Sequence, residues 1–470
     1  MKKLRYLALT TGLLLSASGA ALAASSMSIE QRLNALEQRL QSAEQRAQQA
    51  EARATSAEKR AMQLEQRTAK TEQQTVQVAQ RTASLETQSA PGSNLKLNEL
   101  ADLKLYGDVE FNLDGASRTG QLTSLKSSEK KNWRPGDKER WSVNGRILVG
   151  LDGYRRNQDG NFSGFSVQPL ADMTGKMNLD DAALFFGNEN NWRAKIGRFE
   201  AYDMFPLNQD TFIQYSGNTA NDLYADGFGY IYMMKEGRGR SNSGGNVMLS
   251  KYAGDWYFEL NTLVEDGTSL FQDRQYHGNT LENSKNVAYL RPVVAWKKQE
   301  FSAAVAMESN VVNNAYGYWD EQGEWVNQSK RNGYGMTLSW NNTATHPDNG
   351  VVANLNTAYL DASGEQNFTT GINVLWKRFE LGYIYAHNDI KQFNISGINV
   401  DVNSPLSEPG KYDIHTIHTS YLIPNIMDMK NFNLYLGAYV SMLETNAENN
   451  IVNSGNDQRY GARARFKYFF

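Results

Sequence analysis

The last thirteen residues, Gln458 to Phe470, alternate between apolar and polar side chains, and this alternation most constrains the fold. Successive side chains of a β-strand point to opposite faces, so the segment predicts a strand with one apolar face and one basic face. The apolar face carries Tyr460, Ala462, Ala464, Phe466, Tyr468 and Phe470. The basic face carries Arg459, Arg463, Arg465 and Lys467.

The same period of two recurs from Leu103 onward, in about seventeen segments. One core cannot bury so many apolar faces, whereas a closed barrel presents them to lipid and keeps its polar faces in water. The pattern therefore predicts an all-β fold, a closed antiparallel transmembrane β-barrel over residues 103–470. Tryptophans near the ends of the apolar rows are typical of a girdle at the lipid interface. These are Trp141, Trp192, Trp256, Trp340 and Trp376.

The number of strands depends on residues 216–235. A single-chain bacterial barrel has an even number of strands, so we favour eighteen, with a hairpin in this region, over the alternative of sixteen without it. The connections alternate between long and short, as in outer-membrane barrels. Long connections are expected at 115–138, 264–285, 310–332, 388–410 and 445–457, and short turns at 157–160, 187–191, 297–300 and 377–378.

Residues 1–23 have the three parts of a secretory signal peptide: a basic start, an apolar run from Leu7 to Leu15, and a small-residue cleavage site at 21–23. Removal of Lys2, Lys3 and Arg5 would change the formal net charge from −3 to −6, because three positive charges are lost. Such a mildly acidic chain does not suggest a nucleic-acid partner. The chain has no cysteine, so thiolate metal sites and cysteine nucleophiles are excluded.

Residues 24–87 predict an α-helical coiled coil, because small or apolar residues recur at spacings of three and four from Ile29 to Leu85. Glutamate and arginine flank this seam, and a parallel arrangement pairs them with each other, whereas an antiparallel one would pair like charges. The pattern therefore favours a parallel homo-oligomer, followed by a linker at 88–102. The glutamates are Glu37, Glu44, Glu51, Glu58, Glu65 and Glu72, and the arginines are Arg32, Arg39, Arg46, Arg53, Arg60 and Arg67.

Three parts of the chain resemble known outer-membrane proteins. The aromatic C-terminal strand, with Tyr460, Phe466, Tyr468 and Phe470, resembles the membrane-insertion signal of bacterial barrels. Residues 192–199, the loop after them and residues 226–230 resemble a strand, an inward-folded third loop and the next strand of sugar porins of the maltoporin type. The coil before the barrel resembles the sucrose porin, and the whole layout resembles raffinose-type glycoporins. These resemblances imply a trimer of eighteen-stranded barrels that pass oligosaccharides.

The pore is predicted to be narrowed by the loop at residues 200–215, folded into the lumen. Its acidic side chains would face basic side chains of the wall, and the opposed charges would order water and disfavour apolar solutes. The loop contributes Glu200, Tyr202, Asp203, Phe205, Asp210, Phe212 and Tyr215. The wall contributes Arg146, Arg193, Lys195, Arg463, Arg465 and Lys467.

The expected function is an outer-membrane channel of a Gram-negative bacterium for passive, facilitated diffusion of sugars or oligosaccharides. Two alternatives stay open: a general non-specific porin, and a structural tether that links the membrane to the cell wall through a periplasmic coil. We expect no enzymatic activity, no cofactor and no metal. The expected partners are two further copies of the chain in a homotrimer, lipid and lipopolysaccharide, permeant sugars, and peptidoglycan at the coil.

Overall fold

The computed structural model describes residues 94–97, 101–116, 140–200, 232, 244–271, 274–392, 394, 409–447 and 457–470. The chain separates into two compact units, Met1–Gln73 and Gln74–Phe470, and every described residue belongs to the second. The predicted signal peptide at 1–23 and the predicted coiled coil at 24–87 lie outside the described residues. Within the described part of the chain, no helix is both long enough and apolar enough to cross a membrane.

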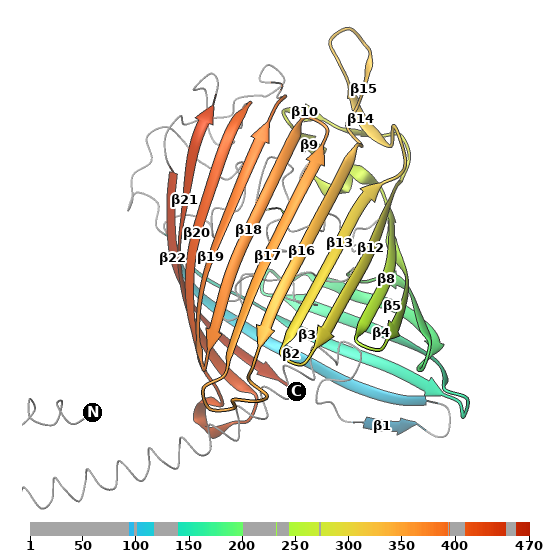
Figure 1. The fold of residues 1–470 in the computed structure, drawn as a ribbon, viewed down its shortest axis with the longest axis vertical. Coiled ribbons are helices and arrows are strands. Elements are labelled where there is room, and N and C mark those ends of the chain that lie inside the picture. The colour runs from blue at the N-terminus through green and yellow to red at the C-terminus, as the bar shows by residue number, and fades with distance from the viewer. Residues whose placement is uncertain are drawn as a thin grey trace, which may run out of the picture. The chain divides into compact units, whose positions relative to one another are not determined.

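Sixteen strands of the described residues form a closed antiparallel ring, in which each strand pairs with the next along the chain and β22 pairs with β2 (Figure 1). A further short strand, β1 (Asn94–Leu97), pairs with the start of β2. The ring contains β2 (Ala101–Ala116), β3 (Arg140–Arg156), β4 (Asn161–Asp172), β5 (Met177–Asn188), β6 (Trp192–Arg198), β7 (Gly245–Ala253), β8 (Trp256–Glu265), β12 (Val287–Lys298), β13 (Phe301–Asn310), β16 (Arg331–Asn341), β17 (Val351–Ala362), β18 (Glu365–Trp376), β19 (Phe379–Ile390), β20 (Gly410–Ile423), β21 (Phe432–Ala447) and β22 (Asp457–Phe469).

The sixteen-strand alternative is therefore supported, and the preference for eighteen strands is not confirmed. The extra hairpin was expected from residues 216–235, between β6 and β7 in the chain. However, β6 pairs directly with β7, from Arg193 opposite Ser250 to Gly197 opposite Asn246. Because the ring is already closed at this point, it has no place for two more strands there.

The long connections lie at one end of the ring, as expected, and the four predicted short turns lie at the other, while two further short turns, 173–176 and 363–364, lie at the end with the long connections (Figure 1). The end that holds Phe470 has short turns, such as 157–160 and 377–378, and we call it the terminal end. The other end, the loop end, carries the long connections. Two of these contain short elements: η4 (Gly267–Leu270), β9 (Gln275–Tyr276), β10 (Asn279–Thr280) and β11 (Glu282–Asn283) follow β8, and β14 (Tyr316–Trp319) and β15 (Trp325–Asn327) follow β13.

The outer surface of the ring is apolar. Leu113, Val143 and Val305 are between 50% and 59% exposed, and they belong to rows whose neighbouring positions point inward. Of the predicted girdle, Trp192, Trp256, Trp340 and Trp376 lie at strand ends near the terminal end, and Trp141 lies near the loop end. An outward apolar band bordered by aromatic residues is typical of a barrel embedded in lipid.

The C-terminal strand closes the ring with the predicted face outward. Phe466 and Tyr468 are each more than a third exposed and pack near the ring of Phe432. Phe470 extends the pairing, because its backbone exchanges two hydrogen bonds of 3.1 Å with Gly107. Glycine is needed at position 107, because a Cβ there would lie 2.2 Å from the Leu148 carbonyl oxygen and 2.6 Å from the Phe470 ring. The role of this face as an insertion signal stays a prediction.

Candidate functional site

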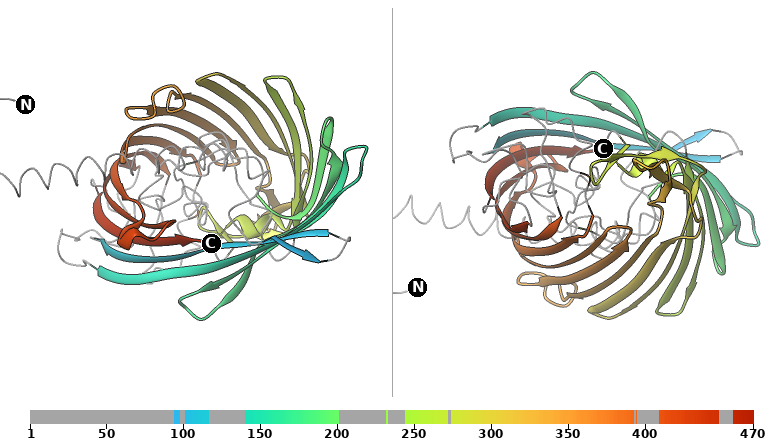
Figure 2. Two further views of the ribbon diagram at one scale, coloured as in Figure 1. Left: turned by 90° about the horizontal axis from the view of Figure 1, so that it is seen from below. Right: turned by 90° about the horizontal axis from the view of Figure 1, so that it is seen from above.

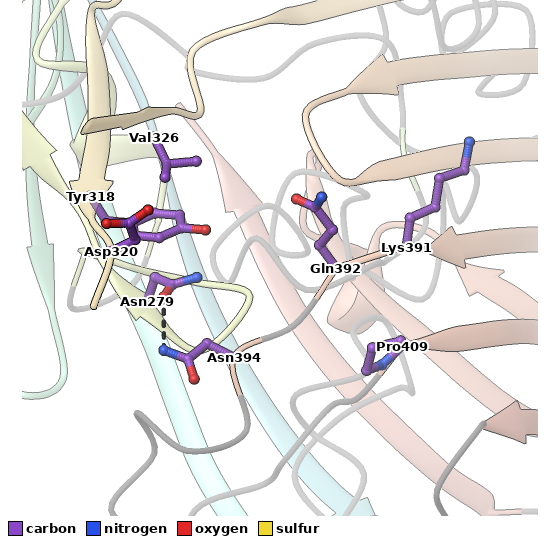
Figure 3. A pocket seen from close by; sticks show the side chains of 8 residues that line it. All are labelled: Asn279, Tyr318, Asp320, Val326, Lys391, Gln392, Asn394 and Pro409. Atoms are coloured by element: carbon purple, nitrogen blue, oxygen red, sulfur yellow. Dashed lines mark hydrogen bonds between the residues drawn. The ribbon is translucent and has the colours of Figure 1, made fainter. Parts of the chain in front are cut away.

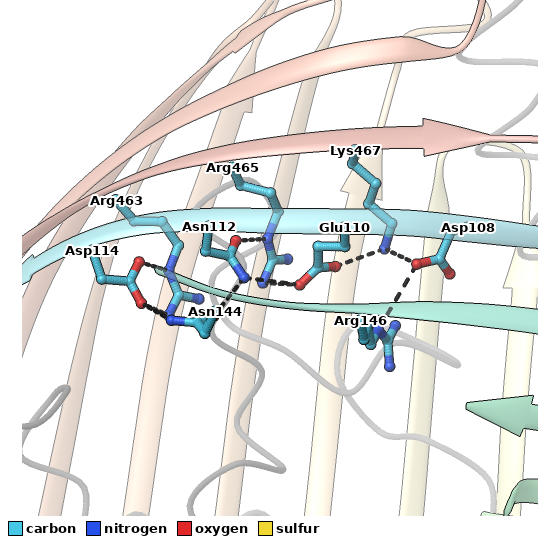
Figure 4. A network of polar contacts seen from close by, with 9 residues as sticks. All are labelled: Asp108, Glu110, Asn112, Asp114, Asn144, Arg146, Arg463, Arg465 and Lys467. Carbon is cyan, nitrogen blue, oxygen red and sulfur yellow. Dashed lines mark hydrogen bonds and ion pairs between the residues drawn. The ribbon is translucent and has the colours of Figure 1, made fainter. Parts of the chain in front are cut away.

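The inner faces of β22, β2 and β3 carry a continuous network of charged and amide side chains, which we call the charged seam (Figure 4). Arg463 forms a two-point contact with Asp114, with nitrogen–oxygen distances of 2.6 and 2.8 Å. Arg465 contacts both Asn112 and Glu110 at 2.8 Å. The strand register explains these contacts, because Asp114 lies directly opposite Arg463 and Asn112 directly opposite Arg465.

The seam continues toward the terminal end and onto β3. Lys467 lies 3.2 Å from Glu110 and 3.7 Å from Asp108, and Arg146 lies 3.8 Å from Asp108. The amide of Asn144 joins the β2 and β3 sides, since it donates to Asp114 at 2.7 Å and accepts from Asn112 at 2.9 Å. The alternation of acids and bases gives this wall many hydrogen-bond donors and acceptors side by side.

An inward-pointing tyrosine extends the seam. The hydroxyl of Tyr106 donates to Asp152 at 3.0 Å and accepts from the amide of Gln168 at 2.8 Å. Its ring lies against Gly150 on β3, where a Cβ would come within 2.3 Å of the ring. The seam therefore presents one aromatic face among its charged groups.

The predicted wall bases all lie on ring strands, and several of them pair with acids of the wall itself. Arg463, Arg465 and Lys467 contact acids on the neighbouring strand. That the acids of the loop at residues 200–215 also face them across the lumen stays a prediction. Of the remaining bases, Lys195 lies 4.0 Å from Asp181, and the guanidinium of Arg193 lies 5.3 Å from the centre of the Phe162 ring. The sequence pattern identified the bases, but not that β2 would close the ring beside β22 with acids at matching positions.

Of the predicted constriction loop, the structure describes Glu200; Tyr202, Asp203, Phe205, Asp210, Phe212 and Tyr215 lie outside the described residues. Two described residues of the same connection are buried. Phe199 packs with Ala183 and Met248, and Tyr232 is 0% exposed, with its hydroxyl donating to Glu308 of β13 at 2.7 Å. Glu308 also pairs with Arg291 at 3.0 Å, and both are almost fully buried. The connection between β6 and β7 therefore contacts the wall at β13.

A second connection, which the sequence pattern did not predict to turn inward, also packs against the inside of the wall. The connection after β8, which begins with the short helix η4, lies within the circle of strands in both views of Figure 2. Its Phe271, Tyr276 and Leu281 form a buried cluster with Leu263 of β8 and Tyr289 of β12. This connection was expected only as one of the long connections, at 264–285. Its aromatic residues were the available signal, but they have no period that distinguishes a packed loop from an exposed one.

Four side chains hold this connection to the wall, and we call them the buried clamp: Tyr276, His277, Arg331 and Glu365. Arg331 pairs with Glu365 at 3.1 Å, and both side chains are 0% exposed. The Tyr276 hydroxyl lies 2.8 Å from both a Glu365 carboxylate oxygen and the Ser363 carbonyl oxygen, which share its single proton. Burial raises the pKa of Tyr276 well above its ordinary value, so this hydroxyl stays protonated and donates at neutral pH.

A third polar group, the amide wall, runs across β16 to β20. Ser339 donates to Asn354, Asn354 to Asn373, and Asn373 to Glu380, at 2.5, 2.8 and 3.2 Å. Ser420 donates to the other oxygen of Glu380 at 2.6 Å. Asn354, Asn373, Glu380 and Ser420 are each at most 2% exposed, so this network stiffens the wall, whereas the seam is the more accessible polar surface.

The described residues contain no group of three histidine, cysteine, aspartate or glutamate side chains placed to hold a metal ion. His415 and His418, which lie on the same strand, point to opposite faces, as their spacing predicts. His415 bonds to the Tyr383 hydroxyl at 2.7 Å, and His418 is buried opposite Gly382.

Comparison with known proteins supports the assignment of the fold. The sequence model of the family described as porin-like glycoporin RafY matches residues 105–470, and that of the maltoporin periplasmic N-terminal extension matches residues 28–58. A search of curated protein sequences gave no match.

Among the solved structures that match this chain are those of DcaP and OprB. The outer membrane channel DcaP of Acinetobacter baumannii is 15% identical with a TM-score of 0.48, and the match covers 81% of this chain and 100% of DcaP. OprB of Pseudomonas putida is 10% identical with a TM-score of 0.49, and the match covers 78% of this chain and 94% of OprB. With scores this low, neither likeness supports a conclusion about function. The match to the glycoporin family, in contrast, covers most of the chain and all of the ring except the first residues of β2. This chain therefore belongs to the porin-like glycoporin RafY family, and it is an outer-membrane porin.

Proposed function

We propose that this porin is a channel for passive diffusion of sugars and oligosaccharides, and that their path runs along the charged seam. The observation that carries the proposal is the row of alternating acids and bases on the inner faces of β22 and β2. A sugar hydroxyl both donates and accepts hydrogen bonds, so such a wall offers it successive partners as it moves. No single step along the row needs to bind tightly, which favours passage over retention.

The proposed constriction has two parts. One is the loop at residues 200–215, whose acids and aromatic rings would face the seam. Support for its inward course comes from Phe199 and Tyr232, the buried residues on either side of it. The other is the connection after β8, which the buried clamp attaches to the wall. A lumen narrowed in this way would select solutes by size and by hydrogen-bonding capacity rather than by charge alone.

We further propose that the channel works as a homotrimer, with residues 24–87 as a parallel coiled coil in the periplasm. The pairing of glutamate and arginine beside the apolar stripe of the predicted coil supports this assembly. The match of residues 28–58 to the periplasmic extension of maltoporin agrees with the position of the coil. If the coil serves assembly or spacing only, deletion of residues 24–90 will leave sugar flux per pore unchanged. A tether to peptidoglycan would instead show as cell-wall sedimentation that is lost on the same deletion.

The proposal is tested with the purified full-length protein in two assays. Liposome swelling in isotonic maltotriose or raffinose measures sugar flux, and planar bilayers measure ionic conductance. We expect ohmic channels and swelling with both sugars at rates above those with a charged solute of equal size. Open channels that admit sugars no faster than the charged solute would favour a general non-specific porin. A lack of any conductance would contradict the proposed passage of solutes through the barrel.

A further inference from the structure

A pocket at the loop end, outside the seam and the buried clamp, has a volume of about 530 Å³ (Figure 3). Three connections line it. Asn279 comes from the connection after β8, Tyr318 and Asp320 come from the β14–β15 hairpin, and Gln392 and Asn394 come from the connection after β19. This volume lies within the range of about 300–1,000 Å³ that small-molecule sites have.

The pocket is held together by specific contacts among these connections. The side chain of Asn394 donates to the side-chain oxygen of Asn279 at 3.0 Å, and its backbone N–H donates to the His277 carbonyl oxygen at 2.8 Å. His277 belongs to the buried clamp, which fixes the connection below the pocket. Preorganised groups of this kind bind a ligand without a further ordering cost.

The hairpin that supplies one side of the pocket is also fixed. Its strand β14 pairs with β11 of the preceding connection, from Asn283 opposite Tyr316 to Glu282 opposite Gly317. The Oδ1 of Asp320 accepts from the backbone N–H groups of Gln322 and Glu324, at 3.0 and 2.7 Å. These bonds close the turn at the tip and hold the Asp320 carboxylate beside Tyr318.

The lining has the chemistry of a site for a neutral polyhydroxylated ligand. Tyr318 offers a half-buried ring face, on which the C–H face of a sugar ring can lie, and burial together with nearby Asp320 raises the pKa of its hydroxyl. Figure 3 shows Gln392 on the other side of the space, across from Tyr318 and Asp320. Amides, a carboxylate and a hydroxyl supply both donors and acceptors. Lys391 at the rim balances the formal charge of Asp320, so the lining favours no net charge.

We propose that this pocket is a binding site for a neutral oligosaccharide of about two or three rings, placed at the mouth ahead of the seam. The proposal rests on the proposed function for the identity of the sugar class, but not for the existence of the site. In this arrangement Tyr318 stacks on one sugar ring, and Asp320, Gln392 and Asn394 bind its hydroxyls. Its effect is to raise the local concentration of the solute before it enters the lumen.

The test uses the native oligomer with maltotriose and raffinose as probes, with calorimetry for binding and swelling for flux. Tyr318→Ala should weaken binding about tenfold, the loss expected for one good contact of this kind. Gln392→Ala, an exposed side chain whose loss does not threaten folding, should weaken it by about twofold to threefold. The matched control is Trp319→Ala, because Trp319 adjoins Tyr318 on the same strand and points away from the pocket. It should leave binding unchanged.

The outcomes separate the site from the function. Saturable binding that falls in Tyr318→Ala and Gln392→Ala but not in Trp319→Ala supports the site, and it does so even if no sugar crosses the membrane. Rapid sugar flux without saturable binding, or binding that neither pocket variant changes, overturns the site while the proposed function stands. If the protein shows no saturable sugar binding and no sugar flux, both the site and the proposed function are overturned.

Discussion

The charged seam and the buried clamp both consist of acids and bases on the inner wall, but they differ in exposure. The Arg463 and Asp114 side chains of the seam are 19% and 18% exposed, whereas Arg331 and Glu365 of the clamp are each 0% exposed. A buried charge that loses its partner is left without water, while a partly exposed one is rehydrated. The same pairing of acids and bases therefore stabilises a packed connection at the clamp, whereas at the seam it sets the electric field that solvent and solutes meet.

The largest effect is expected from the clamp. Arg331→Ala removes the arginine that pairs with the buried Glu365 and should lower the free energy of unfolding by about 3–5 kcal/mol. Release of the connection after β8 should also raise single-channel conductance. Urea unfolding in detergent micelles measures the first effect, and planar bilayers measure the second.

Lys330→Ala is the matched control for Arg331→Ala. Lys330 pairs with Asp361 at 3.1 Å, but its side chain is 62% exposed, so the expected loss is about 0.2–1 kcal/mol. If both variants lose the same free energy, burial is not what distinguishes the clamp.

A smaller effect is expected when one hydrogen bond of the clamp is removed. Tyr276→Phe keeps the ring and the packing of the cluster but takes away the donor to Glu365, so we expect a loss of about 1.5–3 kcal/mol. The same unfolding assay applies. A loss as large as that of Arg331→Ala would mean that the hydrogen bond from Tyr276 contributes as much to the clamp as the ion pair does.

The seam should respond more in selectivity than in stability. Arg463→Ala leaves Asp114 unbalanced but in contact with water, so we expect a loss of about 1 kcal/mol and a shift of the reversal potential toward cations. Arg465→Ala should shift it in the same direction, because Glu110 then lacks its closest base.

The double variant Arg463→Ala with Asp114→Ala should restore the native reversal potential, because it removes both charges of the pair. Arg156→Ala serves as the control, since its pair with Glu189 is at the terminal rim. If neither seam variant shifts the potential, the permeating ions do not pass along these strands.

The smallest effect is expected at a turn that belongs to neither set. Glu300 accepts hydrogen bonds from the Thr345 hydroxyl and from the Trp340 indole, the latter at 3.0 Å, and the bond from Thr345 lowers the pKa of Glu300 below its ordinary value. Because the pKa is lower in the folded state, the ionised carboxylate stabilises the fold at pH values above its ordinary pKa. This stabilisation is lost as the pH falls through the pKa of the folded state.

Unfolding midpoints at neutral and at strongly acidic pH test this prediction. The decrease between the two should be slightly smaller in Glu300→Gln than in the native protein, because the amide does not titrate. An equal decrease in both proteins would show that this carboxylate has no part in the acid sensitivity of the fold.

The sequence by itself determined the class of fold, the faces of the strands and the positions of the turns. Those properties depend on the alternation of side chains along a strand and on the residues that favour turns, and both can be recognised from a short stretch of sequence alone. This is why the outward face of residues 460–470 and the long connections were predicted, whereas the role of the wall bases in a constriction stays a prediction. The coiled coil rests on the same kind of local period, and it stays a prediction.

Tertiary structure alone decided the strand number, the partners of the bases and the inward course of the connection after β8. Ring closure sets β22 beside β2, which brings Asp114 opposite Arg463 from the far end of the chain. The clamp joins Tyr276 to Glu365, which are 89 residues apart. Such contacts depend on how many strands complete the circle and on which loop fits inside it, and both are properties of the closed ring that no local period encodes.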